Sequence, residues 1–221
     1  MGRGVIGVLV SGGLDSAVLV AESALNYRVV WPIYVRQQLA WERVELYWLG
    51  RYLSSLQKET NHLKPLTILS MPMQDVYGNH WSTGRGTVPG AKSDDKAVYL
   101  PGRNLLLSLK PAVFAVMHKI PTLALGSLDH NPFSDAAPAF FQQWGSVLSR
   151  GLGSRIRIIA PYRHKSKEEV IRRGQEWPLH LSFSCIAPEG KFHCGRCNKC
   201  AERRRAFKQA GVQDKTIYVK N

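Results

Sequence analysis

Acidic residues are scarce in this sequence: Asp and Glu number 16 against 30 Lys and Arg, so the formal net charge is +14. A strongly basic protein attracts polyanions such as nucleic acids or nucleotides. The positive charge is scattered, however, and only one stretch concentrates it: Lys199, Arg203, Arg204, Arg205 and Lys208. Nucleic acid is therefore a possible partner that the composition does not favour.

Cysteines are few, and long hydrophobic runs are missing. All four cysteines lie between positions 185 and 200, which excludes a disulfide framework spread over a secreted fold. No apolar run approaches the ~20 residues that a membrane-spanning helix needs. The first run, residues 5–10, is too short for a secretory signal and leads into glycines. We expect a cytoplasmic protein without a membrane anchor.

The length and the apolar content predict one globular unit. The chain has 221 residues, of which 44% are hydrophobic, enough for a substantial core. We expect a single α/β domain over residues 1–221, with residues 180–221 as a metal-binding C-terminal segment.

Short apolar runs alternate with longer amphipathic stretches, which is the pattern of an α/β fold. The apolar runs lack strict alternation, as is typical of buried parallel strands. Strands are predicted at residues 5–10, 28–35, 66–71, 122–126 and 156–160. Helices are predicted at residues 16–24, 40–56, 103–118, 135–149 and 166–176. The last helix opens with Ser166 and has Glu169 three positions later, a capping box. Residues 72–96 form a polar stretch whose length favours a functional loop.

A glycine loop follows the first predicted strand, with the sequence Ser-Gly-Gly-Leu-Asp-Ser at residues 11–16. Glycines permit a tight turn that brings backbone N–H groups near phosphate oxygens, and the next helix adds its positive N-terminus. The lysine of the GxxxxGK[ST] loop and the spacing of GxGxxG are both missing. A plain turn with Asp15 as helix N-cap is the alternative. We predict that phosphate binds at Val10, Ser11, Gly12, Gly13, Leu14, Asp15, Ser16 and Ala17.

The cysteines follow the spacing C-x8-C-x2-C-x2-C at Cys185, Cys194, Cys197 and Cys200. Four thiolates at this spacing can enclose tetrahedral zinc, and a site filled by protein ligands is structural. Two disulfides do not suit a cytoplasmic setting. An iron–sulfur cluster and the replacement of one thiolate by His193 are alternatives. We predict a structural Zn²⁺ site.

Four elements, in this order, resemble the 7-cyano-7-deazaguanine synthase family (QueC or ExsB), which belongs to the PP-loop ATP pyrophosphatases. They are residues 11–16, residues 99–104 (Tyr-Leu-Pro-Gly-Arg-Asn), the acidic segment 129–135 and the cysteine cluster. The resemblance spans nearly the whole chain. It implies a doubly wound, mostly parallel α/β sheet of the adenine nucleotide α-hydrolase type. It also implies a homodimer, for which Trp41, Tyr47 and Trp48 are candidate interface residues.

Enzymes of this family adenylate the carboxylate of 7-carboxy-7-deazaguanine with ATP, and ammonia converts the adenylate into an amide. A second activation then dehydrates the amide to the nitrile. The resemblance therefore implies a carbon–nitrogen ligase that uses ATP and Mg²⁺ on a small carboxylate substrate.

The catalytic candidates are Asp15, Arg103, Asp129 and Asp135. Arg103 suits a contact to phosphate or carboxylate, and Asn104 beside it is either a helix cap or a substrate contact. Either Asp129 or Asp135 could hold Mg²⁺ on the ATP phosphates. Asp135 could instead cap the helix that follows it. His130 and Asn131 belong to the same acidic segment.

Two loops depart from the family pattern. After the second strand the family has Asp-Tyr-Gly-Gln-Arg-His, whereas residues 34–39 read Tyr-Val-Arg-Gln-Gln-Leu; after the fourth strand Ser-Gly-Tyr-Pro-Asp-Cys is replaced by Asn-Pro-Phe-Ser-Asp-Ala at 131–136. Both loops lie where the base would bind. Three alternatives follow: activation of another carboxylate, modification of a tRNA base, or a zinc-ribbon protein that binds nucleic acid.

Overall fold

The computed structural model describes residues 3–129 and 133–219. Five parallel strands form one sheet in the order β3-β2-β1-β4-β5. They are β1 (Arg3–Leu9), β2 (Tyr27–Arg36), β3 (Thr67–Ser70), β4 (Thr122–Ala124) and β5 (Arg157–Ile159). Every predicted strand is thus confirmed, with ends displaced by up to two residues, and so is the doubly wound class.

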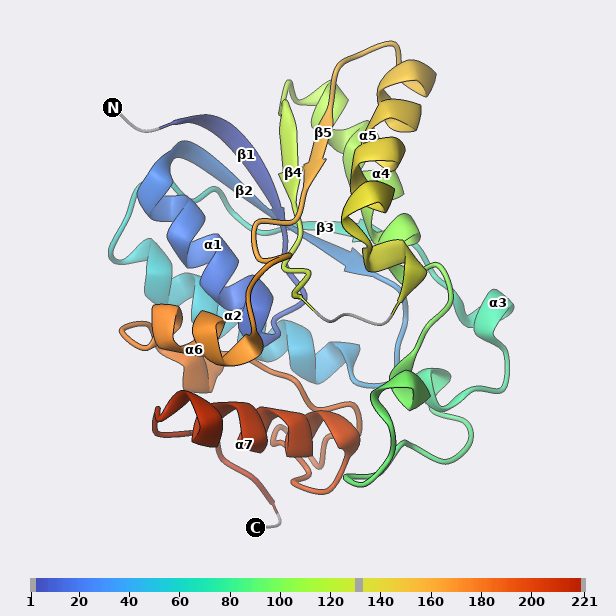
Figure 1. The fold of residues 1–221 in the computed structure, drawn as a ribbon, viewed down its shortest axis with the longest axis vertical. Coiled ribbons are helices and arrows are strands. Elements are labelled where there is room, and N and C mark those ends of the chain that lie inside the picture. The colour runs from blue at the N-terminus through green and yellow to red at the C-terminus, as the bar shows by residue number, and fades with distance from the viewer. Residues whose placement is uncertain (1–2, 130–132, 220–221) are drawn as a thin grey trace.

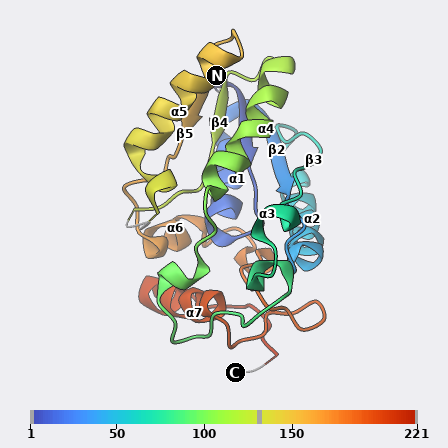
Figure 2. The same cartoon turned by 90° about the vertical axis from the view of Figure 1, so that its right-hand side faces the viewer.

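Helices cover both faces of the sheet (Figures 1 and 2). The longer ones are α1 (Leu14–Asn26), α2 (Glu42–Gln57), α4 (Arg103–Met117), α5 (Pro138–Gly151), α6 (Lys167–Gly174) and α7 (Asn198–Ala210). Apolar side chains of α1, α2, α6 and α7 share one buried cluster, and those of α4 and α5 share another on the opposite face. Among the described residues, no helix combines the length and the apolar character needed to cross a membrane.

All five predicted helices form, but one of them begins later than expected, and the structure contains a further long helix, α7. The helix expected at 135–149 is preceded by a separate 3-10 turn, Ser134–Ala136, because α5 begins at Pro138, a residue favoured in a first helical turn. The capping box of α6 is confirmed: Ser166 Oγ accepts from Glu169 N at 3.2 Å, and Glu169 Oε2 accepts from Ser166 N at 2.7 Å. Helix α7 is not predicted by the sequence reasoning.

The stretch at 72–96 contains the short helix α3 (Gln74–Tyr77) and a 3-10 turn (Trp81–Thr83), and a second 3-10 turn (Asp95–Val98) begins at its end. The stretch packs against the cysteine segment. The rings of Trp41 and Trp81 stack at 5.6 Å, and Asn198 N donates to Pro89 O at 2.9 Å. Because Trp41 is only 3% exposed, its suggested place at a subunit interface is wrong.

One residue of the basic stretch near the C-terminus is buried and cannot contribute to a basic surface. Arg203 on α7 is 1% exposed, and its guanidinium donates to Ser182 Oγ (2.9 Å), Ser184 Oγ (3.2 Å) and Leu179 O (2.9 Å). It also donates to Thr216 Oγ1 at 2.9 Å. Arg203 therefore joins α7 to the segments before and after it.

Replacing this arginine tests its role. We expect Arg203→Met to lower the free energy of unfolding by about 3 kcal/mol, because buried partners lose their donor. Arg205→Met, on the exposed side of the same helix, is the matched control and should change stability by less than about 0.5 kcal/mol. The measurement is urea denaturation at fixed zinc concentration; equal effects of the two substitutions would contradict the assignment.

Candidate active site

A cavity of about 580 Å³ lies at the carboxyl ends of β1, β2 and β4. Open α/β sheets bind ligands at this edge, where the strand order reverses. Helix α7 forms the opposite wall through Lys199, Glu202, Arg205 and Gln209, and Figure 1 shows it lying across the end of the sheet. The cavity therefore lies between the glycine loop and the C-terminal segment.

The glycine loop turns sharply from β1 into α1. Gly12 has φ +78°, a left-handed conformation that disfavours other residues, and Gly13 precedes the first helical residue, Leu14. The hydroxyls of Ser11 and Ser16 lie 3.3 Å apart, and Ser16 Oγ also donates to Gly13 O at 3.1 Å. Gly13 rather than Asp15 is therefore the N-cap residue, and the alternative reading of Asp15 as a cap is wrong.

The residues predicted around this loop have two environments. Val10, Ser11, Gly13, Asp15 and Ser16 line the cavity. Leu14 and Ala17 are buried in the hydrophobic core, and a Cβ on Gly12 would lie 3.2 Å from Glu45 Cγ. The first N–H groups of a helix have no intrahelical acceptor, so the start of α1 offers donors beside the cavity.

Asp15 belongs to an ionic cluster that joins the loop to α7. Its Oδ2 lies 3.6 Å from Lys167 Nζ, and Lys167 also pairs with Glu202, which accepts from Lys199 Nζ at 2.5 Å. Burial raises the pKa of Asp15, while Lys167 acts in the opposite direction. Burial alone would raise the pKa of Glu202 too, but Lys167 and Lys199 outweigh it and lower that pKa to about 2. Glu202 is therefore ionised at neutral pH.

The wall formed by the end of β2 and the start of α2 carries further polar groups. The Tyr34 hydroxyl donates to Glu45 Oε2 at 2.5 Å, and burial raises the pKa of Glu45 to about 7. Glu42 accepts from the backbone N–H groups of Gln37 and Gln38, the latter at 3.0 Å. These contacts fix the turn after β2, so that the buried side chain of Gln37 lines the cavity.

Helix α4 brings Arg103 and Asn104 to the same cavity. Asp135 accepts from Asn104 N at 2.8 Å and from Asn104 Nδ2 at 3.3 Å, so its carboxylate secures the first turn of α4 rather than the helix after it. Asp129 also lines the cavity, and its N–H donates to Lys165 O at 3.1 Å. His130 and Asn131 lie outside the described residues.

Unsatisfied polar atoms concentrate in this cavity. Of the five buried side-chain nitrogen and oxygen atoms that lack a hydrogen-bond partner in the described part of the chain, four belong to cavity-lining residues: Asp15 Oδ1, Gln37 Nε2, Arg103 Nε and Ser127 Oγ. A buried polar atom without a partner costs roughly 1–3 kcal/mol. Such atoms are expected where a ligand completes their hydrogen bonds.

The four cysteines meet at the start of α7. Their Sγ atoms all lie within 4.8 Å of one another, with Cys185–Cys197 and Cys194–Cys200 each at 3.9 Å, and all four are buried. Backbone N–H groups of Ala187, Cys194 and Arg196 point to these sulfurs at 3.3–3.5 Å. His193 is not part of the group, since its Nε2 accepts from Ser184 N at 3.1 Å. The cluster can therefore bind a metal through four sulfurs.

Several site residues carry no recognisable signal in the sequence. Lys167 and Glu202 come from separate helices and meet only in the fold. Tyr34, Gln37 and Glu45 lie within or near the loop that departs from the family pattern, where Tyr34 reads as an ordinary strand residue. For Lys167 the sequence predicts only its place at the start of a helix, through the capping box of Ser166 and Glu169.

Comparison with known proteins agrees with this arrangement. The family model "Queuosine biosynthesis protein QueC" matches residues 5–211. The 7-cyano-7-deazaguanine synthase of Methanothermobacter thermautotrophicus is 29% identical over 223 residues, covering 95% of this chain and 97% of its own length. The 7-cyano-7-deazaguanine synthase of Methanocaldococcus jannaschii is 29% identical over 234 residues, covering 96% of this chain and 97% of its own length.

A solved structure shares the fold. The complex of a 4-thiouridine synthetase with RNA and bound ATP matches 94% of this chain and 50% of its own, with a TM-score of 0.52 and 14% identity. The family match covers far more than half of the sequence, including the glycine loop, all strands apart from the first two residues of β1, and the cysteines. The chain belongs to the QueC family of queuosine biosynthesis proteins.

Proposed function

We propose that this chain is an ATP-dependent carbon–nitrogen ligase that converts 7-carboxy-7-deazaguanine and ammonia into 7-cyano-7-deazaguanine. The observation that carries the proposal is the cavity beside the glycine loop, with its four unpartnered buried polar atoms. The choice of substrate is supported by the relatives named above, which are 7-cyano-7-deazaguanine synthases. Ammonia as nitrogen source and the homodimer stay predictions from the family, and the cytoplasmic location stays a prediction from the sequence.

The reaction needs an activated carboxylate. A carboxylate oxygen attacks the α-phosphorus of ATP and displaces pyrophosphate; ammonia then attacks the acyl carbon and displaces AMP, leaving the amide. In the second round the amide oxygen attacks another α-phosphorus, and loss of AMP and two protons leaves the nitrile. The protein must hold the phosphates and keep water from the acyl-adenylate.

The ATP phosphates fit the wall made by the glycine loop. The N-terminus of α1 supplies N–H donors and positive potential, and Ser11 and Ser16 supply hydroxyls. Lys167 adds a fixed positive charge beside Asp15. We assign the triphosphate to this wall because these groups converge on the cavity.

The acceptor carboxylate fits the part of the cavity lined by Arg103 and Gln37. Arg103 Nε and Gln37 Nε2 are buried donors without a partner among the described residues, and a carboxylate accepts hydrogen bonds only. Asp135 holds Asn104, the neighbour of Arg103, so we propose that it positions this arginine. For Mg²⁺, which would neutralise phosphate charge, we propose Asp129 and Asp15 as ligands.

The cysteine cluster fits a structural zinc ion. A tetrahedron with ~2.3 Å zinc–sulfur bonds has edges of about 3.8 Å, close to the two 3.9 Å sulfur pairs. Four thiolates around one ion lie closer together than thiolates that each bind a different iron of a cluster. We therefore propose Zn²⁺ rather than an iron–sulfur cluster.

Mass spectrometry tests the reaction directly. The enzyme, ATP, Mg²⁺, ammonium and 7-carboxy-7-deazaguanine should give the nitrile together with AMP and pyrophosphate. AMP and pyrophosphate without nitrile would move the proposal to another carboxylate or to a tRNA base. No ATP cleavage, combined with strongly salt-dependent RNA binding, would contradict it in favour of a nucleic-acid-binding protein.

Asp15→Asn tests the assignment of the glycine loop. We expect pyrophosphate release to fall by roughly 100-fold or more, because a proposed Mg²⁺ ligand that also pairs with Lys167 is lost while the side chain keeps its shape. Asp75→Asn, on the exposed helix α3, is the matched control. Unchanged turnover of the Asp15 variant would remove this loop from the mechanism.

Cys197→Ser tests the metal site. Cys197 is the residue that precedes α7, and serine is itself a good N-cap, so the substitution isolates the loss of a metal ligand. We expect zinc content and thermal stability to fall together, because metal binding is coupled to folding. Stoichiometric zinc in the variant, measured by elemental analysis, would contradict the four-sulfur assignment.

A further inference from the structure

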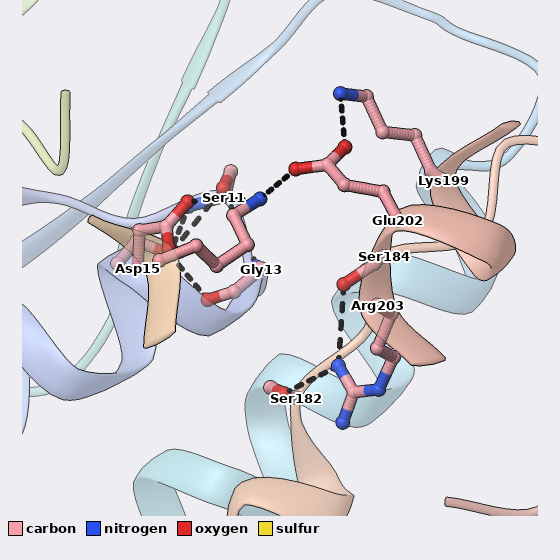
Figure 3. Close-up of polar contacts among 10 residues, drawn as sticks. Ser11, Gly13, Asp15, Ser182, Ser184, Lys199, Glu202 and Arg203 are labelled. Atoms are coloured by element: carbon pink, nitrogen blue, oxygen red, sulfur yellow. Dashed lines mark hydrogen bonds and ion pairs between the residues drawn. The ribbon is translucent and has the colours of Figure 1, made fainter. Parts of the chain in front are cut away.

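Helix α7 links the cysteine cluster to the glycine loop through its side chains. Cys200, near the start of the helix, belongs to the cluster, and Glu202 follows it by two residues. Glu202 binds Lys199 through one oxygen and Lys167 through the other, and Lys167 Nζ lies 3.6 Å from Asp15 Oδ2. Figure 3 shows Glu202 extending from α7 toward the loop that carries Asp15.

A second link runs through the backbone. Phe183 N donates to Gly12 O at 2.7 Å, two residues before Cys185. Phe183 is 1% exposed and packs against His193 at a ring distance of 4.5 Å. Arg203 donates to the hydroxyls on either side of Phe183, as Figure 3 shows. Both links start from the metal-binding segment, and they end on two residues of the same loop, Gly12 and Asp15.

Glu202 restricts Lys167. A lysine side chain has a flexible four-carbon stem, so each partner of its ammonium further restricts where that group lies. The side chain of Lys167 is 21% exposed, so it is largely enclosed between Asp15 and Glu202. Without the Glu202 carboxylate, the ammonium has one partner fewer and more freedom to leave the loop.

We propose that Glu202 is a positioning residue that couples the cysteine cluster to the ATP loop, so that metal binding and ATP binding strengthen each other. This inference rests on the proposed ATP and zinc sites. The metal fixes the start of α7, Glu202 then holds Lys167 against Asp15, and the loop is held in the conformation that receives the phosphates. Because coupling between two sites is reciprocal, bound ATP must tighten metal binding by the same factor.

Binding of α,β-methylene-ATP with Mg²⁺, measured by calorimetry, separates positioning from simple charge. Removing a carboxylate from a cavity that binds a polyanion should tighten binding if charge alone acts. We expect Glu202→Gln to weaken binding roughly tenfold instead. Glu168→Gln is the matched control, because it removes another carboxylate that lines the cavity, from helix α6, and should not weaken binding. Equal or tighter binding by Glu202→Gln than by the unaltered protein would overturn the proposal.

Metal retention tests the coupling in the unaltered protein, whether or not the variant folds. Zinc is titrated away with a competing chelator at equilibrium, with and without saturating α,β-methylene-ATP and Mg²⁺. We expect the analogue to raise the apparent zinc affinity roughly tenfold, and this gain to vanish in Glu202→Gln. If the unaltered protein binds the analogue but its zinc affinity is the same with and without it, the coupling is overturned and the ATP site stands. Failure of the unaltered protein to bind the analogue would overturn the ATP site itself, and the coupling with it.

Discussion

The turn at Gly12 is the constraint on which the rest of the site depends. The chain must pass from β1 into α1 within four residues, and it does so with a left-handed glycine. Any other residue would strain the backbone by roughly 1–2 kcal/mol, and its Cβ would press on Glu45. The neighbouring segments are packed to this turn. A Cβ on Gly126, after β4, would lie 3.1 Å from Asp15 C and Ser16 N, and Phe183 binds the Gly12 carbonyl.

The electrostatics of the cavity differ from those of the protein as a whole. The chain carries a net charge of +14, yet acidic side chains outnumber basic ones around the cavity. A surface that recognises RNA is expected to carry a basic patch or stripe, whereas a site for a metal-bound triphosphate needs both positive and negative side chains. Lys167 and Glu202 form an ion pair inside this site. The positive charge of Lys167 is therefore partly neutralised and attracts a polyanion less strongly.

The sequence predicts those features whose signals are local. The glycine loop, the strands and the cysteine spacing each lie within a short segment, and each appears where the sequence places it. The alternative in which Asp135 caps the helix after it is wrong, because the sequence shows the neighbouring helix but not the approach of Asn104 from a distant one. Arg203 reads as a solvated charge, since nothing local reveals that serine hydroxyls and a carbonyl surround it. Helix α7 has few apolar residues and is positioned by tertiary contacts, for which the sequence gives little warning.

The central claim is that the cavity transfers a carboxylate oxygen to the α-phosphate of ATP. Labelling both carboxylate oxygens of 7-carboxy-7-deazaguanine with ¹⁸O and analysing the nucleotide products by mass spectrometry tests it most directly. The account predicts that each AMP formed during conversion to the nitrile carries one ¹⁸O atom, and that pyrophosphate carries none. Unlabelled AMP, or ADP with labelled phosphate, would contradict it, because the oxygen would then have left by another route.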